Sequence, residues 1–262
     1  MGPQAISALP YEAIDGLVGV LCDIDDTLTW EGELVPDALV ALTRARDAGL
    51  RVVPVTGRPA GWVDHVARMW PVHGCVGENG GLWFFMHEGK LQRRFLQSAD
   101  ARAKNRAKLT RLSSKILAAV PGTALASDQP YRELDLAIDF CEDVPPLGDA
   151  DIDKIVEEFE AAGATCKVSS IHVNGWYGSF DKLHGCRKLV HDRWGEDLDP
   201  TRWLYVGDSA NDEPMFDFFD HSVGVSNVRK FLKRMKAWPT YITSKPGGHG
   251  FVELMERVLA QR

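Results

Sequence analysis

The sequence has little of what would hold a small secreted domain together or carry a chain through a membrane. Its 262 residues include only five cysteines, which are widely spaced without a C-x-x-C pair, so neither a disulfide framework nor a zinc site is indicated. No run of about 18 apolar residues occurs, and the N-terminus has no basic stretch before an apolar one. We therefore expect reduced thiols, a cytoplasmic protein and no membrane partner.

Basic residues are also fewer than acidic ones. The formal net charge is -7, whereas binding to nucleic acid rests on lysine and arginine side chains that neutralise phosphates. We therefore expect no nucleic-acid partner, and we interpret the basic stretch at 99–119 as the solvated face of a helix. Nothing in the sequence indicates an oligomeric state. An apolar content of 45% is sufficient for one large domain or for a core domain that carries a smaller insert.

What the chain does have is a regular alternation of apolar runs and amphipathic helices. An apolar run at 17–22 precedes a helical pattern at 36–49, and a second run at 51–55 precedes another helical pattern at 59–70. The same alternation returns at 203–216 and continues to a final helix. Strands that alternate with helices predict an α/β fold, a Rossmann-like parallel sheet with helices on both faces.

Between these two parts the pattern changes to that of an antiparallel sheet. A hairpin-like stretch leads into the basic helix, a strand at 134–140, a helix at about 149–162, and two strands that we expect to be joined by a turn at Asn174-Gly175. Because hairpins belong to antiparallel sheets, we predict an inserted α+β domain. We place the core at 1–85 and 181–262 and the insert at 86–180.

Acidic and hydroxyl side chains follow several of the predicted parallel strands. Asp23 and Asp25 end the first strand, Thr56 ends the second, and Asp208 and Asp212 follow a later one. Since the carboxyl ends of parallel strands meet at the ligand-binding edge of an open sheet, these side chains should share one site. Gathered carboxylates repel one another unless a cation lies among them. Mg²⁺ fits, because it uses few carboxylates and keeps water and phosphate in its shell.

The same residue types support phosphoryl transfer. The carboxylate of Asp23 can attack phosphorus and form an aspartyl-phosphate, while Asp25 can donate a proton to the leaving alcohol and later activate water. Thr56 and Asn211 can hydrogen-bond phosphate oxygens, and Lys182 is the candidate for neutralising charge in the transition state. We therefore predict a catalytic set that consists of Asp23, Asp25, Thr56 and Lys182.

These motifs, in this order, resemble the four motifs of the haloacid dehalogenase (HAD) superfamily. The matching stretches are Asp23-x-Asp25-Asp26-Thr27-Leu28, then Thr56-Gly57-Arg58, then Lys182, then GDSANDEPMF at 207–216. The stretch GENGG at 77–81 and the position of the insert resemble the Cof-type, class IIB branch, which includes sugar phosphatases.

The resemblance implies a role for each matching residue. Asp23 and Asp208, with the backbone carbonyl of Asp25, would bind Mg²⁺, and Asp212 would support the metal shell. Thr56 and Lys182 would hold the phosphate, and the insert would be a cap over the site. The predicted metal set is therefore Asp23, Asp25, Asp208 and Asp212, and the predicted phosphate set is Thr56, Lys182 and Asn211.

We predict a Mg²⁺-dependent phosphatase, a phosphoric monoester hydrolase that acts on a small phosphorylated metabolite and in particular on a sugar phosphate. Trp176 and Tyr177, in the insert, are candidates for stacking on a sugar ring. Two alternatives stay open. By resemblance, the chain could be a sugar phosphomutase of the phosphomannomutase type, or it could bind a phosphorylated metabolite without turnover.

Overall fold

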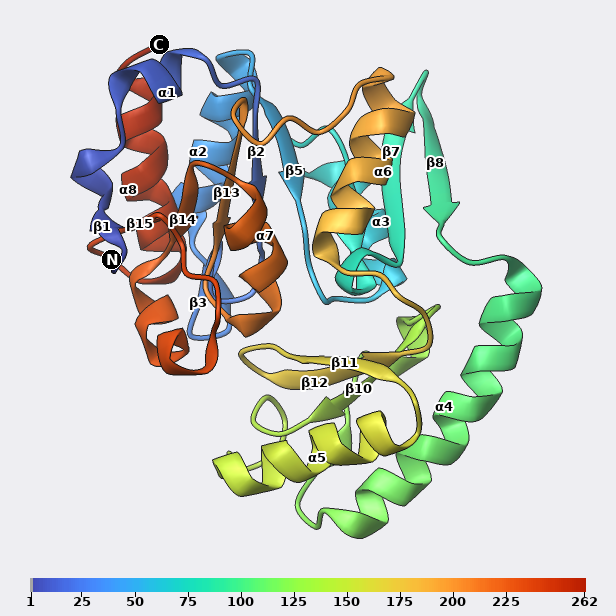
Figure 1. Cartoon of the computed structure of the whole chain (residues 1–262). Helices are drawn as coiled ribbons and strands as arrows, with labels where there is room; N and C mark the ends of the chain where they lie inside the picture. The colour runs from blue at the N-terminus through green and yellow to red at the C-terminus, as the bar shows by residue number, and fades with distance from the viewer. Residues whose placement is uncertain (1) are drawn as a thin grey trace.

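A six-stranded parallel sheet forms the centre of the larger of two bodies (Figure 1). The computed structural model describes residues 2–262. The strand order is β1-β15-β14-β13-β2-β5, and every neighbouring pair is parallel. The strands are β1 (Gln4–Ala5), β2 (Gly19–Cys22), β5 (Arg51–Pro54), β13 (Trp203–Gly207), β14 (Ser222–Gly224) and β15 (Tyr241–Ile242). The prediction of an α/β fold with a parallel sheet is confirmed.

Helices cover both faces of this sheet because its central strands are apolar on both sides. In β2, Val20 and Cys22 belong to one buried cluster and Leu21 belongs to the other. The first cluster includes apolar side chains of α2 (Pro36–Asp47), α3 (Ala60–Met69) and α8 (Gly247–Leu259). The second includes those of α6 (Lys182–Trp194) and α7 (Glu213–Phe218). Strands that are buried on both faces are typical of parallel sheets.

Three smaller elements complete the core. An antiparallel sheet of β6 (Cys75–Gly77), β7 (Leu82–His87) and β8 (Lys90–Phe95) continues the main sheet through a parallel bridge between Val55 and Val76, and it contacts α3 and α6. A short hairpin joins β3 (Thr29–Trp30) to β4 (Glu33–Leu34), and α1 (Tyr11–Asp15) precedes β2. The chain leaves this body after β8, slightly beyond the predicted boundary at residue 86.

The smaller body is an antiparallel sheet backed by two helices (Figure 1). Its strand order is β11-β12-β10-β9, with β9 (Ala124–Leu125), β10 (Asp135–Asp139), β11 (Thr165–Val168) and β12 (His172–Trp176). Apolar side chains of α4 (Ala99–Ala119) and α5 (Asp149–Ala161) pack on one face of the sheet. The other face of the sheet is turned toward the core in Figure 1, so this α+β unit lies over one end of the parallel sheet.

The predicted turn at Asn174-Gly175 is wrong. Both residues lie inside β12, and the chain turns at 169–171 instead. A Cβ atom on Gly175 would overlap the ring of Phe159 in α5, so close packing, rather than a turn, requires glycine here. The stacking role suggested for Trp176 is also excluded, since its side chain is fully buried against Phe180 at a ring-centroid distance of 5.3 Å.

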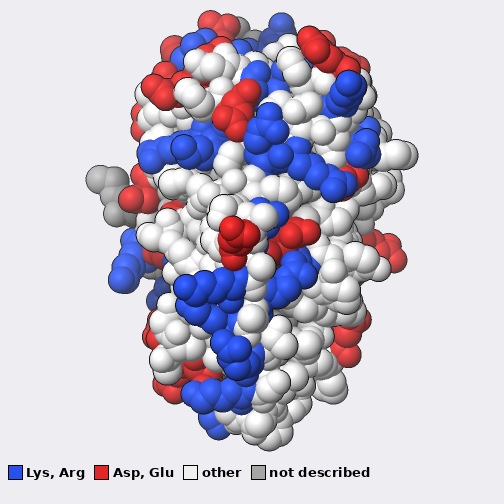
Figure 2. Space-filling model, turned by 90° about the vertical axis from the view of Figure 1, so that its right-hand side faces the viewer, with Lys and Arg blue, Asp and Glu red and all other residues white. Residues whose placement is uncertain are grey.

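Lysine and arginine side chains gather over α4 on one face of the molecule (Figure 2). Several of them form ion pairs with nearby acids, as Lys115 does with Glu158 at 2.6 Å. This agrees with the expected solvated basic face. Among residues 2–262, no helix is both long enough and apolar enough to span a membrane.

Candidate active site

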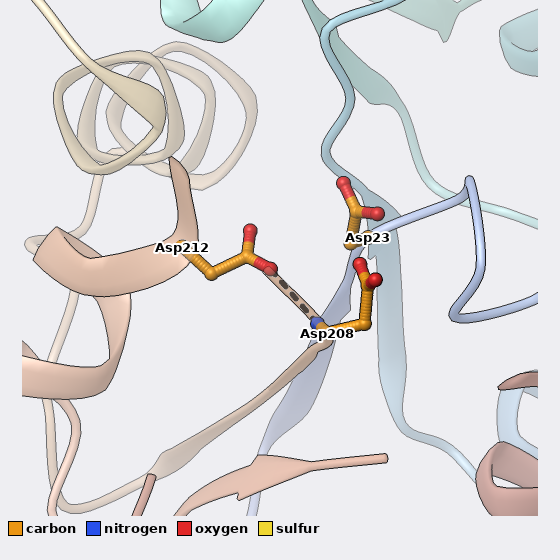
Figure 3. A group of neighbouring side chains, drawn as sticks. All are labelled: Asp23, Asp208 and Asp212. Carbon is orange, nitrogen blue, oxygen red and sulfur yellow. Dashed lines mark hydrogen bonds between the residues drawn. The ribbon is translucent and has the colours of Figure 1, made fainter. Parts of the chain in front are cut away.

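Three buried carboxylates meet where the central strands end. Asp23 follows β2, Asp208 follows β13, and Asp212 lies in the 3-10 turn Ala210–Asp212 just beyond. Each offers an oxygen within 4.8 Å of the others. Figure 3 shows the carboxylates of Asp23 and Asp208 side by side, with Asp212 reaching in from the adjacent turn. The three aspartates therefore meet at the carboxyl ends of the strands, where the sequence predicts them.

Lys182 is the cation inside this cluster. Its side chain is only 1% exposed, and its Nζ donates hydrogen bonds to Asp23 Oδ1 at 2.5 Å and Asp212 Oδ1 at 2.6 Å. Burial alone would lower the pKa of Lys182, but the charges of Asp212 and Asp23 raise it above the usual value. Lys182 is therefore protonated at neutral pH. Its Nζ also lies 3.3 Å from Asn211 Oδ1, so two of the three predicted phosphate ligands, Lys182 and Asn211, are neighbours in this cluster.

Lys182 reaches the cluster because α6 begins against the GENGG stretch. Asp181 caps the helix by accepting a hydrogen bond from the His184 backbone N–H at 2.9 Å. A Cβ atom on Gly80 would overlap the Asp181 carbonyl, and Gly80 has a φ of +98°. Glycine at position 80 therefore permits the close approach that sets Lys182 beside Asp23.

Both carboxylate oxygens of Asp212 are engaged in hydrogen bonds within the site. Its Oδ1 accepts hydrogen bonds from Lys182 and from the Tyr205 hydroxyl at 2.5 Å. Its Oδ2 accepts from the backbone N–H groups of Asp208 at 2.9 Å and Ser209 at 3.1 Å, the first of which is drawn in Figure 3. With both oxygens occupied, Asp212 fixes the loop that carries Asp208.

Asp208 lacks a basic partner. Its carboxylate accepts hydrogen bonds from the Thr27 hydroxyl at 3.4 Å and the Asn227 amide at 3.2 Å, and within residues 2–262 no lysine or arginine bonds it. Burial, and then the charges of Asp23 and Asp212, raise its pKa well above the usual value. Burial also raises the pKa of Asp23, against the opposing effect of Lys182.

The donor set of this cluster fits a hard divalent cation. Three buried carboxylates face a single lysine, so negative charge is in excess, and oxygen atoms are the ligands that Mg²⁺ prefers. Asp23 and Asp208 have carboxylate oxygens to offer, whereas those of Asp212 are taken by hydrogen bonds.

Thr56 lies beside these groups, after β5. Its side chain is buried, and its hydroxyl accepts a hydrogen bond from the Arg58 backbone N–H at 2.9 Å. This bond uses a lone pair of the oxygen and leaves the hydroxyl proton available to a phosphate oxygen. The structure thus brings the predicted site residues to one edge of the sheet, while their individual roles stay predictions.

Asp25 is held by Arg58, which the sequence prediction did not include. Arg58 Nε and Nη2 donate to Asp25 Oδ1 at 3.0 and 2.9 Å, and Nη2 also donates to Glu142 Oε1 of the smaller domain at 2.6 Å. The Thr56-Gly57-Arg58 motif of the sequence could have indicated that Arg58 belongs to the site. No sequence pattern indicated Glu142, because its partner Arg58 lies far away in the sequence. Contacts with His172 and Arg58 lower the pKa of Glu142 to about 2, although burial acts in the opposite direction.

A second buried acid, Glu78 of the GENGG stretch, joins the two domains. Its carboxylate accepts hydrogen bonds from the Ala60 backbone N–H at 3.0 Å and from those of Glu133, Leu134 and Asp135 at 2.8, 2.5 and 3.2 Å. Burial, followed by the charge of Asp135, raises its pKa to about 7. The start of β10 is therefore fastened to the start of α3.

The smaller domain closes over the cluster. A cavity of about 10 Å³ lies between the core and the domain, roughly enough for one water molecule. It is lined by Asp23, Asp25, Gly57, Arg58 and Asn211 with Ser209 from the core and by residues 169–172 with Asn174 from the smaller domain. The inserted domain thus occupies the position of a cap.

Residues 20–104 match a family model described as haloacid dehalogenase-like hydrolase, which confirms the resemblance that the motifs indicate. The matched stretch contains Asp23, Asp25 and Thr56, together with the GENGG stretch.

Individual relatives are phosphatases by name. A phosphoglycolate phosphatase of Methanobrevibacter smithii is 26% identical over 251 residues, 91% of this chain and 97% of that protein. A phosphoglycolate phosphatase of Pyrobaculum neutrophilum is 44% identical over 66 residues, which is 24% of this chain and only 29% of that relative. The C-terminal domain of a C. albicans trehalose-6-phosphate phosphatase superposes with a TM-score of 0.75 at 14% identity, over 99% of this chain and 98% of that one. This last likeness is one of fold.

Proposed function

We propose that this protein is a Mg²⁺-dependent phosphatase that hydrolyses a small phosphorylated metabolite, in particular a sugar phosphate, through an aspartyl-phosphate at Asp23. One observation carries the proposal: Asp23 lies against a buried, protonated lysine on one side and, on the other, the buried carboxylate of Asp208, which accepts no bond from a lysine or arginine of the described residues. The phosphatase names of the relatives support the reaction class.

Mg²⁺ would be held by Asp23, Asp208 and the backbone carbonyl of Asp25. When bound, it would neutralise the carboxylates and draw electron density from the phosphoryl group. Lys182 supplies a second, permanent positive charge next to the carboxylate of Asp23. Thr56 and Asn211 would orient phosphate oxygens, and Asp212 would keep Lys182 and the Asp208 loop in place.

The reaction divides into two displacements. An oxygen of Asp23 bonds to phosphorus as the bond from phosphorus to the ester oxygen breaks, and Asp25 gives its proton to the departing alcohol. Asp25, now a carboxylate, then takes a proton from water, whose oxygen bonds to phosphorus as the bond to Asp23 breaks. Inorganic phosphate leaves, and both aspartates return to their starting forms.

A direct test measures phosphate release from phenyl phosphate with and without Mg²⁺. Hydrolysis that requires Mg²⁺ supports the proposal, and complete inactivity would favour a binding protein without turnover. Product analysis with a sugar monophosphate separates the remaining alternative, since a phosphatase releases inorganic phosphate and a phosphomutase yields an isomeric sugar phosphate.

A further inference from the structure

The cavity around Asp23 and Asp25 has room for about one water molecule, so the leaving group of a substrate must lie outside it. Its volume is about 10 Å³. Two larger cavities adjoin it and share lining residues with it. One has a volume of about 420 Å³ and shares Asp25, Arg58 and Ile171, and the other has about 530 Å³ and shares Ser169 and Ser170.

The position of Asp25 distinguishes the two larger cavities. Asp25 lines the 420 Å³ cavity but not the other, whereas Asp208 and Asn227 line the 530 Å³ cavity. If the proposed function holds, Asp25 delivers its proton to the leaving oxygen, so the leaving group must lie on the Asp25 side. The 420 Å³ cavity, called here the leaving-group pocket, is therefore the one that receives it.

The leaving-group pocket is acidic and partly aromatic. Its acidic lining residues are Asp25, Asp26, Glu31 and Glu142, and its basic one is Arg58. The guanidinium of Arg58 is already engaged by Asp25 and Glu142, so it is not free to bind an anion. Negative charge thus dominates the pocket, and an incoming carboxylate or second phosphate would meet repulsion.

Two tryptophans, Trp62 and Trp70, give the same pocket an apolar side. Trp62 is 42% exposed and carries the Arg58 guanidinium 4.7 Å from its ring centroid. An indole face packs well against the C–H face of a ring, and carboxylates accept hydrogen bonds from hydroxyl or ammonium groups. This combination selects hydroxylated molecules that carry no negative charge.

We propose that the leaving-group pocket admits neutral or amine-bearing hydroxylated leaving groups and rejects anionic ones, with Glu31 and Trp62 as specificity-determining residues. The inference rests on the proposed function for the side from which the proton comes, and it goes beyond that function by assigning the charge of the substrate. It separates this chain from a phosphatase that prefers phosphoglycolate, whose leaving group carries a carboxylate.

The test compares two sets of phosphate esters. The first set has leaving groups without negative charge and contains glucose 6-phosphate, glucosamine 6-phosphate and glycerol 1-phosphate. The second set has leaving groups with a carboxylate and contains phosphoglycolate and 3-phosphoglycerate. We expect the best members of the first set to exceed both anionic esters in kcat/KM by about tenfold or more. A kcat/KM for phosphoglycolate equal to or above theirs would overturn the inference.

Charge reversal supplies a matched pair of variants. Glu31→Lys places a cation in the leaving-group pocket, whereas Glu33→Lys makes the same charge change on the same hairpin outside the pocket. We expect Glu31→Lys to raise kcat/KM for phosphoglycolate, relative to glucose 6-phosphate, by about fivefold and Glu33→Lys to leave this ratio unchanged. Equal effects of the two variants would contradict the assignment of the pocket.

Removal of the indole gives a second pair. Trp62→Ala should raise the KM for hexose phosphates more than that for acetyl phosphate, by about fivefold. Trp238→Ala, which removes a tryptophan of similar exposure (44%) outside the pocket, should change neither. A KM that rises equally for both substrates in Trp62→Ala would argue against a contact with the leaving group.

Calorimetric titration with the same esters keeps this inference distinct from the proposed function. A chain that hydrolyses nothing, acetyl phosphate included, but binds the esters whose leaving groups carry no negative charge more tightly would refute the phosphatase and support the pocket. A chain that hydrolyses acetyl phosphate but works best on phosphoglycolate would support the phosphatase and refute the pocket.

Discussion

Two networks of buried charge lie within one molecule, and they differ in how the charges are matched. At the domain interface, the carboxylates of Asp25 and Glu142 face Arg58, and that of Glu78 faces backbone N–H groups. At the strand ends, the partners of the Asp208 carboxylate among residues 2–262 are a hydroxyl and an amide. Matched charges hold a structure together, and an unmatched buried carboxylate is suited to a ligand that brings the missing charge.

The largest expected effect comes from the unmatched network. Asp23→Asn removes the nucleophile, so we expect kcat to fall by at least ~10⁴-fold in Mg²⁺-dependent phosphate release. Asp37→Asn, an exposed aspartate at the start of α2, is the control and should keep full activity. Circular dichroism checks that both variants fold. Substantial activity in folded Asp23→Asn would remove Asp23 from the mechanism.

Removal of the buried cation should cost stability as well as activity. Lys182→Met leaves the carboxylates of Asp23 and Asp212 without their partner, so the free energy of unfolding should fall by about 3–5 kcal/mol. Lys188→Met, on the exposed side of the same helix, should change it by less than about 0.5 kcal/mol. Urea denaturation measures both, and equal small losses would mean that the ion pairs contribute little.

The interface network should make the free energy of unfolding depend on pH. Because the pKa of Glu78 is raised from 4.5 to about 7 in the folded protein, the folded state binds more protons than the unfolded state between these values. Stability contributed by this group is therefore full below pH 4.5 and decreases by about 3 kcal/mol as the pH rises through 7.

Denaturation between pH 5 and 7.5 measures this slope. Glu78→Gln should flatten it, since the titrating group is gone. Glu88→Gln, an exposed glutamate that also has a positive φ, should keep it. An unchanged slope in Glu78→Gln would show that other groups cause the pH dependence.

Metal binding should produce the smallest of these effects. With Mg²⁺ at 100 times its Kd, the free energy of unfolding should rise by about 2.7 kcal/mol. Asp208→Asn should lose most of this rise, and Asp220→Asn, on the surface, should retain it. Calorimetric melting with and without Mg²⁺ measures the difference. A full Mg²⁺ effect in Asp208→Asn would place the ion elsewhere.

The sequence predicted the strand-end network better than the interface network, and topology explains why. Asp23 and Asp208 follow apolar strands, and parallel strands bring their carboxyl ends together regardless of details. The pairing of Arg58 with Glu142 instead depends on how two domains close, and no local pattern encodes it. Asn227 follows β14, so the same strand-end rule could have identified its contact with Asp208.

The prediction of a turn at Asn174-Gly175 is wrong for a related reason. Asn-Gly favours a turn through local backbone conformation, but Gly175 is needed because the Phe159 ring presses on β12. Asn174 also makes a contact with a residue distant in the sequence, since its amide donates a hydrogen bond to Asp135 Oδ2 at 3.0 Å. Tertiary packing therefore decided the conformation of both residues.

Chemical trapping of the phosphorylated chain tests the central claim most directly. Asp25→Asn, mixed with Mg²⁺ and acetyl phosphate, whose good leaving group needs no proton, should accumulate a phosphoryl group that water cannot readily remove. We predict that mass spectrometry after acid quenching finds it on Asp23, close to one per chain. A phosphoryl group on another residue, or none while the wild-type chain turns over, would contradict the account.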